Sequence, residues 1–199
     1  MTTAWQKTRK TFRHGRLSLA LVEAAVARLE TDGAEALSLR DLARDAGVNH
    51  RAVYRHFPDK LSLLARVAEE GWRRLERRVK QHSAGRSSGE QRLVAAGIGF
   101  FLFARDHPNL FALMAGPRIN VKGAFPGLEA AMTDTMAMFR DPFIDSGLEP
   151  ELARVRTAVF MSALQGVTTQ ILHGRLHVSR AKAKSFIADV CRRLFEGLR

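Results

Sequence analysis

Residues 38–64 read SLRDLARDAGVNHRAVYRHFPDKLSLL, and this stretch decides the fold of the chain. Ser38 is suited to cap a helix, with Asp41 three residues later as in a capping box. Gly47 can adopt the left-handed conformation that ends the helix, and Asn49 is suited to cap a second one. The stretch therefore predicts two short helices around a tight, glycine-containing turn, which is the helix-turn-helix pattern.

The second helix, expected over residues 49–57, has an apolar side and a polar side. Val53 and Phe57 are spaced i, i+4 and face inward. The side chains expected on the outside are His50, Arg51, Tyr54 and Arg55. Pro58 ends the helix, and Asp59 can cap the helix that follows.

Composition and charge favour a soluble protein with an anionic partner. The 199 residues are 46 % hydrophobic and carry 32 Lys and Arg against 20 Asp and Glu, a formal net charge of +12. Nucleic acid is a natural partner for such a chain, because phosphate neutralisation releases counterions. The alternative explanation of the positive charge is an arginine-rich, solvated surface with no nucleic-acid partner. Residues 1–16 are basic and have few apolar side chains, so they are expected to form a flexible arm along DNA or a disordered tail.

The single cysteine and the hydropathy pattern indicate the cellular compartment in which the protein is found. Cys191 alone permits neither an intrachain disulfide nor a cysteine-based zinc site, which fits a reducing cytoplasm. No run of about 18 apolar residues is present, and the basic N-terminus lacks the apolar core of a signal peptide. We therefore expect a cytoplasmic protein with no membrane partner.

The rest of the chain shows apolar residues at helical spacing, and neither strand alternation nor an internal repeat is evident. Helices are expected over residues 17–32, 60–82, 128–144, 150–172 and 180–198, with an apolar segment after residue 90 that breaks before Pro108. The prediction is an all-α fold with three parts. These are the basic arm at residues 1–16, a helix-turn-helix domain at 17–65 and a larger helical domain at 66–199.

Several short motifs resemble the signature of the TetR family of bacterial transcriptional repressors. They are SLRDLA at 38–43, AGV at 46–48 and YRHF at 54–57, followed by Lys60, Leu63 and Leu64; FARDHPNLF at 103–111 is similar to a C-terminal subgroup. The resemblance implies a homodimer whose two helix-turn-helix units bind successive major grooves of a palindromic operator. It also implies that the C-terminal domain dimerises, binds a small molecule and releases the DNA.

The resemblance makes residues 49–57 the recognition helix. His50 and Arg51 would reach base edges, where Arg can read guanine with two hydrogen bonds, and Tyr54, His56 and Lys60 would contact phosphates. Ala52 departs from the pattern, since many relatives carry Thr there and a hydroxyl contact is lost. The full predicted DNA-binding set is Arg16, Ser38, Arg40, Asn49, His50, Arg51, Tyr54, His56 and Lys60. Ordinary solvated or packing roles are the alternative for the tyrosine, the histidine and the helix arginines.

Aromatic and methionine side chains gather in the second half of the chain. Such stripes are often ordinary core, but together they favour an apolar effector, because Met adapts to several ligand shapes. The predicted pocket residues are Phe100, Phe103, Phe111, Met114, Met132, Met136, Phe160 and Gln165. Small residues permit close helix approach, and the predicted dimer interface is Ala158, Ser162, Gly166, Ile187, Val190 and Leu194.

An enzyme is the competing class of protein. His173 and His177 are spaced i, i+4 but lack a third ligand at a matching spacing, and Cys191 lies on an apolar stripe. No glycine-rich phosphate loop is present. We therefore expect no catalytic residue, metal or cofactor. A ligand-independent or architectural DNA-binding protein remains the alternative to a ligand-released repressor.

Overall fold

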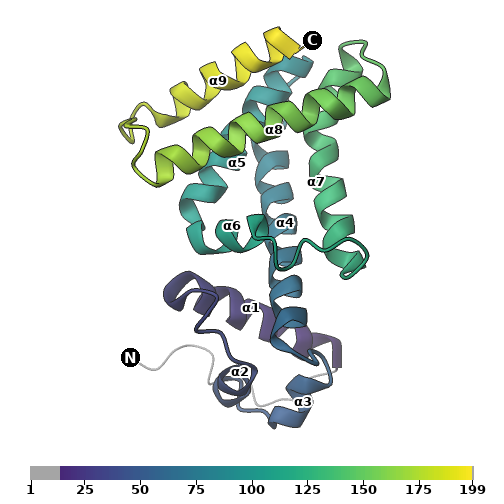
Figure 1. Ribbon diagram of the computed structural model, residues 1–199, viewed down its shortest axis with the longest axis vertical. Helices are drawn as coiled ribbons and strands as arrows, with labels where there is room; N and C mark the ends of the chain where they lie inside the picture. Colours follow the sequence, from purple (N-terminus) through teal and green to yellow (C-terminus); the bar gives the residue numbers. More distant parts are fainter. Residues whose placement is uncertain (1–13, 199) are drawn as a thin grey trace. The chain divides into compact units, whose positions relative to one another are not determined.

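The computed structural model describes residues 14–198, and this part of the chain is helical with no strand (Figure 1). Its helices are α1 His14–Asp32, α2 Leu39–Asp45, α3 His50–Tyr54, α4 Lys60–Ser83, α5 Gly89–Asp106, α6 Pro108–Ala115, α7 Pro126–Asp145, α8 Pro150–Leu172 and α9 Ala183–Leu198. Within the same residues, none of these helices has both the length and the apolar character needed to cross a bilayer. The predicted all-α fold is confirmed.

Several helix boundaries differ from those expected; α9, for example, begins at Ala183 and not at residue 180. α1 begins at His14, so residues 14–16 are helical and do not belong to the basic arm, whose other residues lie outside the described part of the chain. α3 ends early because the N–H groups of His56 and Phe57 both donate to the Val53 carbonyl oxygen at 2.9 Å, which tightens the chain into a turn. α7 starts two residues before its expected position and continues through Pro142.

The chain divides into two compact units, residues 1–67 and 68–199, called here the N-terminal and the C-terminal unit. The start of α4 belongs to the N-terminal unit and the remainder of that helix to the C-terminal unit. In the N-terminal unit, apolar side chains from all four of its helices are removed from solvent. The most deeply buried include Leu21, Leu29, Leu42, Val53, Phe57 and Leu63.

In the C-terminal unit, α5 is the central helix and contacts α6, α7, α8 and α9 (Figure 1). Its residues from Phe100 to Ala104 are all buried, as expected for a helix surrounded by others. Gly97 faces α9, where a β-carbon on this residue would overlap the sulfur of Cys191. Gly97 therefore allows these two helices to pack directly against each other.

Phenylalanine rings connect the helices around α5. Phe139 of α7 lies 6.2 Å from Phe100 and 6.4 Å from Phe160, measured between ring centroids. Phe143 continues the chain of contacts, at 6.2 Å from Phe160 and 5.4 Å from Phe195 of α9. Edge-to-face and tilted pairs at these distances are favourable beyond the area they bury. The rings thus tie α5, α7, α8 and α9 into one core.

Candidate nucleic-acid interface and ligand cavity

Local hydrogen bonds define the helix-turn-helix. The Asp41 N–H donates to the Ser38 hydroxyl oxygen at 3.4 Å, which caps α2. Gly47 has a φ of 63°, a left-handed conformation that side chains with a β-carbon disfavour. The Arg51 N–H then donates to the Asn49 carboxamide oxygen at 2.9 Å and caps α3. The turn and the start of α3 are therefore fixed by residues adjacent in sequence.

The buried side of α3 determines which side chains it presents outward. Val53 and Phe57 are 0 % and 1 % exposed. On the opposite side His50 and Arg51 are exposed and Tyr54 retains 47 % of its accessible surface. The His50 and Tyr54 rings lie 6.5 Å apart and nearly perpendicular, at 85°. The structure thus brings these three predicted contact residues together on one outer face.

The other predicted DNA-binding residues have more varied surroundings. His56 is half-buried, with its ring 6.4 Å from that of Phe57. The Lys60 ammonium donates to the Glu35 carbonyl oxygen at 2.8 Å, which leaves two of its three N–H groups for another acceptor. Ser38 and Asn49 serve as helix caps. The backbone of Arg16 lies in α1, and its side chain is outside the described part of the chain.

The two arginines of α2 differ in their partners. Arg44 pairs with Asp41 at 2.8 Å, so its charge is partly neutralised. Arg40 is exposed and forms no ion pair with any residue from 14 to 198. Of the two, only Arg40 presents an uncompensated charge.

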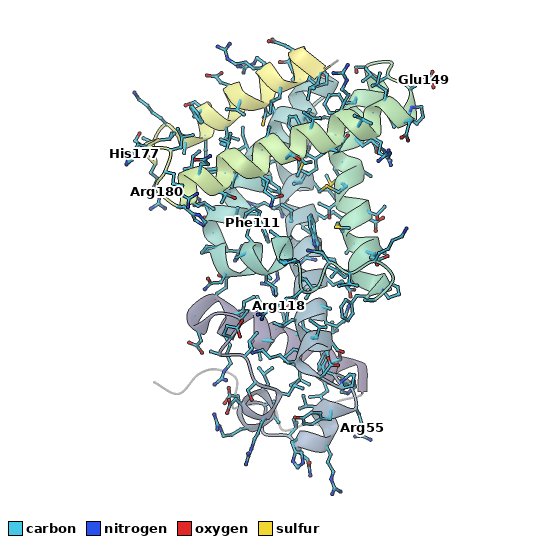
Figure 2. All side chains as sticks on the ribbon, in the orientation of Figure 1. Arg55, Phe111, Arg118, Glu149, His177 and Arg180 are labelled. Atoms are coloured by element: carbon cyan, nitrogen blue, oxygen red, sulfur yellow. The ribbon has the colours of Figure 1, made fainter. Side chains whose placement is uncertain are left out.

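Arg55 adds a further cation that the predicted DNA-binding set did not include. It is the C-cap of α3 and its side chain is exposed (Figure 2). No ion pair joins it to the part of the chain that the structure describes. In the sequence, its position outside the apolar stripe of the helix was the feature that could have identified it as a possible DNA contact. With Arg51 and Arg40, it makes the exposed side of α2 and α3 cationic.

Asp59 occupies donors at the start of α4. Its carboxylate accepts hydrogen bonds from the N–H and the hydroxyl of Ser62, both at 2.7 Å. The backbone hydrogen bond from Ser62 is the main cause that lowers the pKa of Asp59. The helix start is therefore capped by the Asp59 carboxylate, as expected, and this leaves fewer free N–H groups for a phosphate.

A cavity of about 520 Å³ lies inside the C-terminal unit. Helices α4 to α8 and the loop after α6 contribute to its wall. Its apolar lining residues are Trp72, Leu75, Phe100, Phe111, Met114, Ala115, Ile119, Val121, Leu128, Met132, Met136 and Met161, and its polar ones are Asn120, Lys122, Glu129, Thr133 and Gln165. Figure 2 shows Phe111 on α6 and Arg118 on the loop that follows it.

Six of the eight predicted pocket residues line this cavity, namely Phe100, Phe111, Met114, Met132, Met136 and Gln165. Phe103 and Phe160 do not. Phe160 is fully buried between the rings of Phe139 and Phe143, and Phe103 packs on the ring of His107 at 5.2 Å. Both side chains therefore serve helix packing and are not part of the cavity wall.

Several lining residues could not be identified from the sequence. Trp72 and Leu75 lie on the apolar stripe of α4, which is indistinguishable from a packing stripe in the sequence. Residues 119–122 come from an irregular loop, whose position depends on specific contacts. Ile119 is 1 % exposed, and the Asn120 amide donates to the carbonyl oxygens of Met114 and Gly116 at 3.0 and 2.7 Å. The loop is thus pinned as part of the wall.

The predicted dimer residues fall into two groups. Ala158, Ser162 and Gly166 are exposed on α8, beside Val155 and Val159 at 46 % and 47 % exposure. Val190 and Leu194 of α9 are half-buried. Ile187 is 0 % exposed within its own protomer, so it belongs to the core and is not available to a partner.

The described residues contain no metal site, and their one cysteine is buried. Residues 14–198 contain no group of three His, Cys, Asp or Glu side chains placed to hold a metal ion, and His173 and His177 are both exposed. Burial raises the pKa of the Cys191 thiol to about 12. The thiol therefore stays protonated and unreactive at neutral pH.

Both parts of the chain match known protein families. Residues 21–67 match the model for bacterial regulatory proteins of the tetR family, and residues 93–193 match that for the tetracyclin repressor-like C-terminal domain. A solved protein of unknown function from Rhodococcus sp. RHA1 is 27 % identical, with a TM-score of 0.80 and coverage of 96 % of this chain and 98 % of its own.

Two further solved structures share the fold at lower identity. A TetR variant from Acinetobacter baumannii AYE in complex with minocycline is 17 % identical, with a TM-score of 0.67 and coverage of 94 % and 96 % of the two chains. The fatty acid degradation regulator FadR from Bacillus halodurans is 15 % identical, with a TM-score of 0.63 and coverage of 96 % and 99 %.

Proposed function

The chain belongs to the tetR family of bacterial regulatory proteins and is thus a DNA-binding transcriptional regulator, and we propose that it is a dimeric repressor released from a palindromic operator by a small apolar effector. The observation that carries the proposal is the outer face of α3. There His50, Arg51 and Tyr54 are exposed together, while Val53 and Phe57 anchor the helix from behind.

In the proposed complex, base and phosphate contacts are divided among different residues. Arg51 and His50 read base edges in the major groove. Tyr54, His56 and Lys60 position the helix through phosphates, and Arg40 and Arg55 add phosphate contacts from the same cationic side. The exposure and lack of ion-pair partners of both added arginines within residues 14–198 support this assignment.

The cavity is the proposed effector site. Its volume of about 520 Å³ falls within the ~300–1,000 Å³ typical of small-molecule sites, and its wall is mainly apolar. Trp72 and Leu75 line it from α4, the helix whose first residues belong to the N-terminal unit. An effector that favours one position of α4 would change the spacing of the two recognition helices in the dimer. That spacing must match one turn of DNA.

The proposed dimer uses the exposed face of α8 together with α9. Val155, Val159 and Leu152 expose nearly half of their surfaces, and Ala158 and Gly166 allow a partner helix to approach closely. Two helices from each protomer would form a four-helix bundle around the two-fold axis. Sedimentation at micromolar concentration tests this: the parent protein should be a dimer and Val159→Arg a monomer. Leu19→Arg, which alters an even more exposed apolar residue of the N-terminal unit, should leave the dimer intact.

The operator experiment begins with genomic fragments captured by the purified protein and footprinted to find the protected sequence. Arg51→Ala should lose about 1–3 kcal/mol of discrimination between the best site and single-base variants. Lys60→Ala should weaken binding to all sequences alike and reduce the salt slope by about 1. Arg86→Ala, an exposed arginine in the loop after α4, is the control and should bind as the parent does. Equal loss of specificity in the Arg51 and Lys60 variants would contradict the proposed division.

A further inference from the structure

We propose that the effector is an apolar molecule with one acidic group, a hydrocarbon-bodied monocarboxylic acid whose carboxylate is bound by Lys122. This inference rests on the proposed role of the cavity as the effector site and specifies the chemical class of molecule that fits it. It follows from the composition of the wall, from the way the loop after α6 is held, and from the hydrogen-bonding capacity that the lining residues leave unused.

The wall selects an apolar and flexible body. Trp72, Phe100 and Phe111 supply broad apolar surfaces. Four methionines complete the wall: Met114, Met132, Met136 and Met161. Unbranched thioether side chains repack around ligands of different shape, so this wall accommodates a hydrocarbon chain in several conformations. A rigid ligand rich in polar groups would leave its hydrogen-bonding groups unpaired against these side chains.

The loop after α6 holds Lys122 at the cavity. Ile119 anchors the loop by burial, and the Asn120 amide is bonded to two backbone carbonyl oxygens. On the other side of Lys122, the N–H of Gly123 donates to the carboxylate of Glu129. The lysine is therefore flanked by fixed points, although its own side chain is exposed.

The unused polar groups of the lining favour an anion. Lys122 forms no hydrogen bond or ion pair with any residue from 14 to 198, and it is the only cation among the lining residues. Glu129 already accepts the Gly123 N–H, and the Thr133 hydroxyl donates to the Glu129 carbonyl oxygen at 2.8 Å. A carboxylate paired with Lys122 gains a charge-assisted hydrogen bond, whereas a cation could pair only with Glu129, the one acid of the lining, whose carboxylate already holds the Gly123 N–H.

The test compares three probes with the same hydrocarbon chain: decanoate, decan-1-ol and decyltrimethylammonium, each below its critical micelle concentration. Trp5→Phe leaves Trp72 as the only tryptophan, so its fluorescence reports occupancy of the cavity. In this background decanoate should bind more tightly than the alcohol, and the ammonium compound should bind most weakly. Lys122→Gln should weaken decanoate about two- to fivefold, the range of a solvent-accessible ion pair, and leave decan-1-ol unchanged.

Two further variants complete the design. Lys122→Glu should reverse the order, so that the ammonium compound binds better than decanoate. Lys184→Gln, which changes an exposed lysine of α9 that does not line the cavity, should match the parent. Equal affinity for decanoate and decan-1-ol, no effect of Lys122→Gln, or no response of Trp72 to any probe would overturn the proposal. Decanoate that binds with the expected lysine dependence but leaves operator binding unchanged would support anion recognition while contradicting the proposed release mechanism.

Discussion

The outer face of α3 and the cavity of the C-terminal unit are assembled in different ways. The first is set by hydrogen bonds between near neighbours in sequence: Ser38 with Asp41 and Asn49 with Arg51, with Gly47 at the turn between them. The cavity takes its wall from five helices and a loop spread over about half of the chain. A surface built locally tolerates changes elsewhere, whereas a cavity depends on the packing of every helix around it.

The largest effect is expected for Phe139→Ala in α7. The ring is 0 % exposed and contacts Phe100 and Phe160, so its removal leaves a void among packed aromatic rings. We expect a loss of about 3–5 kcal/mol in the free energy of unfolding of the C-terminal unit. Urea denaturation followed by circular dichroism measures it.

Met136→Ala is the matched control for this prediction. Met136 lies one turn earlier on α7, is half-buried and already borders an open cavity, so its truncation should cost markedly less. Equal losses in the two variants would mean that the phenylalanine contacts do not hold the unit together, and that the contrast between a packed core and an open cavity is wrong.

The second prediction concerns the contact between α4 and the start of α7. A β-carbon on Gly127 would lie 2.7 Å from an oxygen of Glu69, a carboxylate that is 3 % exposed and paired with Arg73 at 2.5 Å. Gly127→Ala should therefore destabilise the C-terminal unit by about 1–3 kcal/mol through overpacking. Gly197→Ala in α9 meets no atom within 4 Å and should stabilise that helix slightly. Urea denaturation of the two variants measures the difference, and the Gly127→Ala variant should have the lower midpoint.

The contrast between the two regions also explains what the sequence could and could not predict. Caps and turns depend on residue type at fixed local spacing, so Ser38, Gly47 and Asn49 were sufficient to place α2 and α3. The exposed face of α3 followed from Val53 and Phe57 alone. Only the end of the helix was misplaced, because the bonds from His56 and Phe57 to one carbonyl depend on the path of the chain before Pro58.

For the cavity, residue type indicated which side chains could line it, but not whether each one lines it or packs in the core. Phe100 and Phe160 are both apolar residues on helical stripes, yet one lines the cavity and the other packs between two rings. What separates them is the rotation of each helix relative to its neighbours, which is set by long-range packing. Lys122 was missed for a similar reason, since its position depends on how Ile119 and Asn120 hold the loop.

A smaller effect is expected from Gly47→Ala in the turn between α2 and α3. The backbone there has a φ of 63°, and a β-carbon meets no atom within 4 Å, so the only penalty is the left-handed conformation. We expect a loss of about 1–2 kcal/mol from the N-terminal unit, with the operator preferred by the parent retained. Amide hydrogen exchange in α2 and α3 measures the stability, and footprinting checks the preference. A changed operator preference would show that the turn also orients α3, and that the face is less locally determined than its hydrogen bonds indicate.

The smallest effect is a pH dependence at the start of α4. The hydrogen bonds from Ser62 hold the pKa of Asp59 below its ordinary value of 3.8, so this carboxylate binds a proton less readily in the folded than in the unfolded chain. Its contribution to stability is therefore complete above 3.8 and is lost as the pH falls through the lower, folded value. The chemical shift of the Ser62 amide proton should titrate with a midpoint below 3.8, and in Asp59→Asn, which keeps an uncharged cap, that titration should be absent. A midpoint at or above the ordinary value would mean that Asp59 does not cap α4 in solution. The Ser62 N–H would then be free to donate a hydrogen bond to a DNA phosphate.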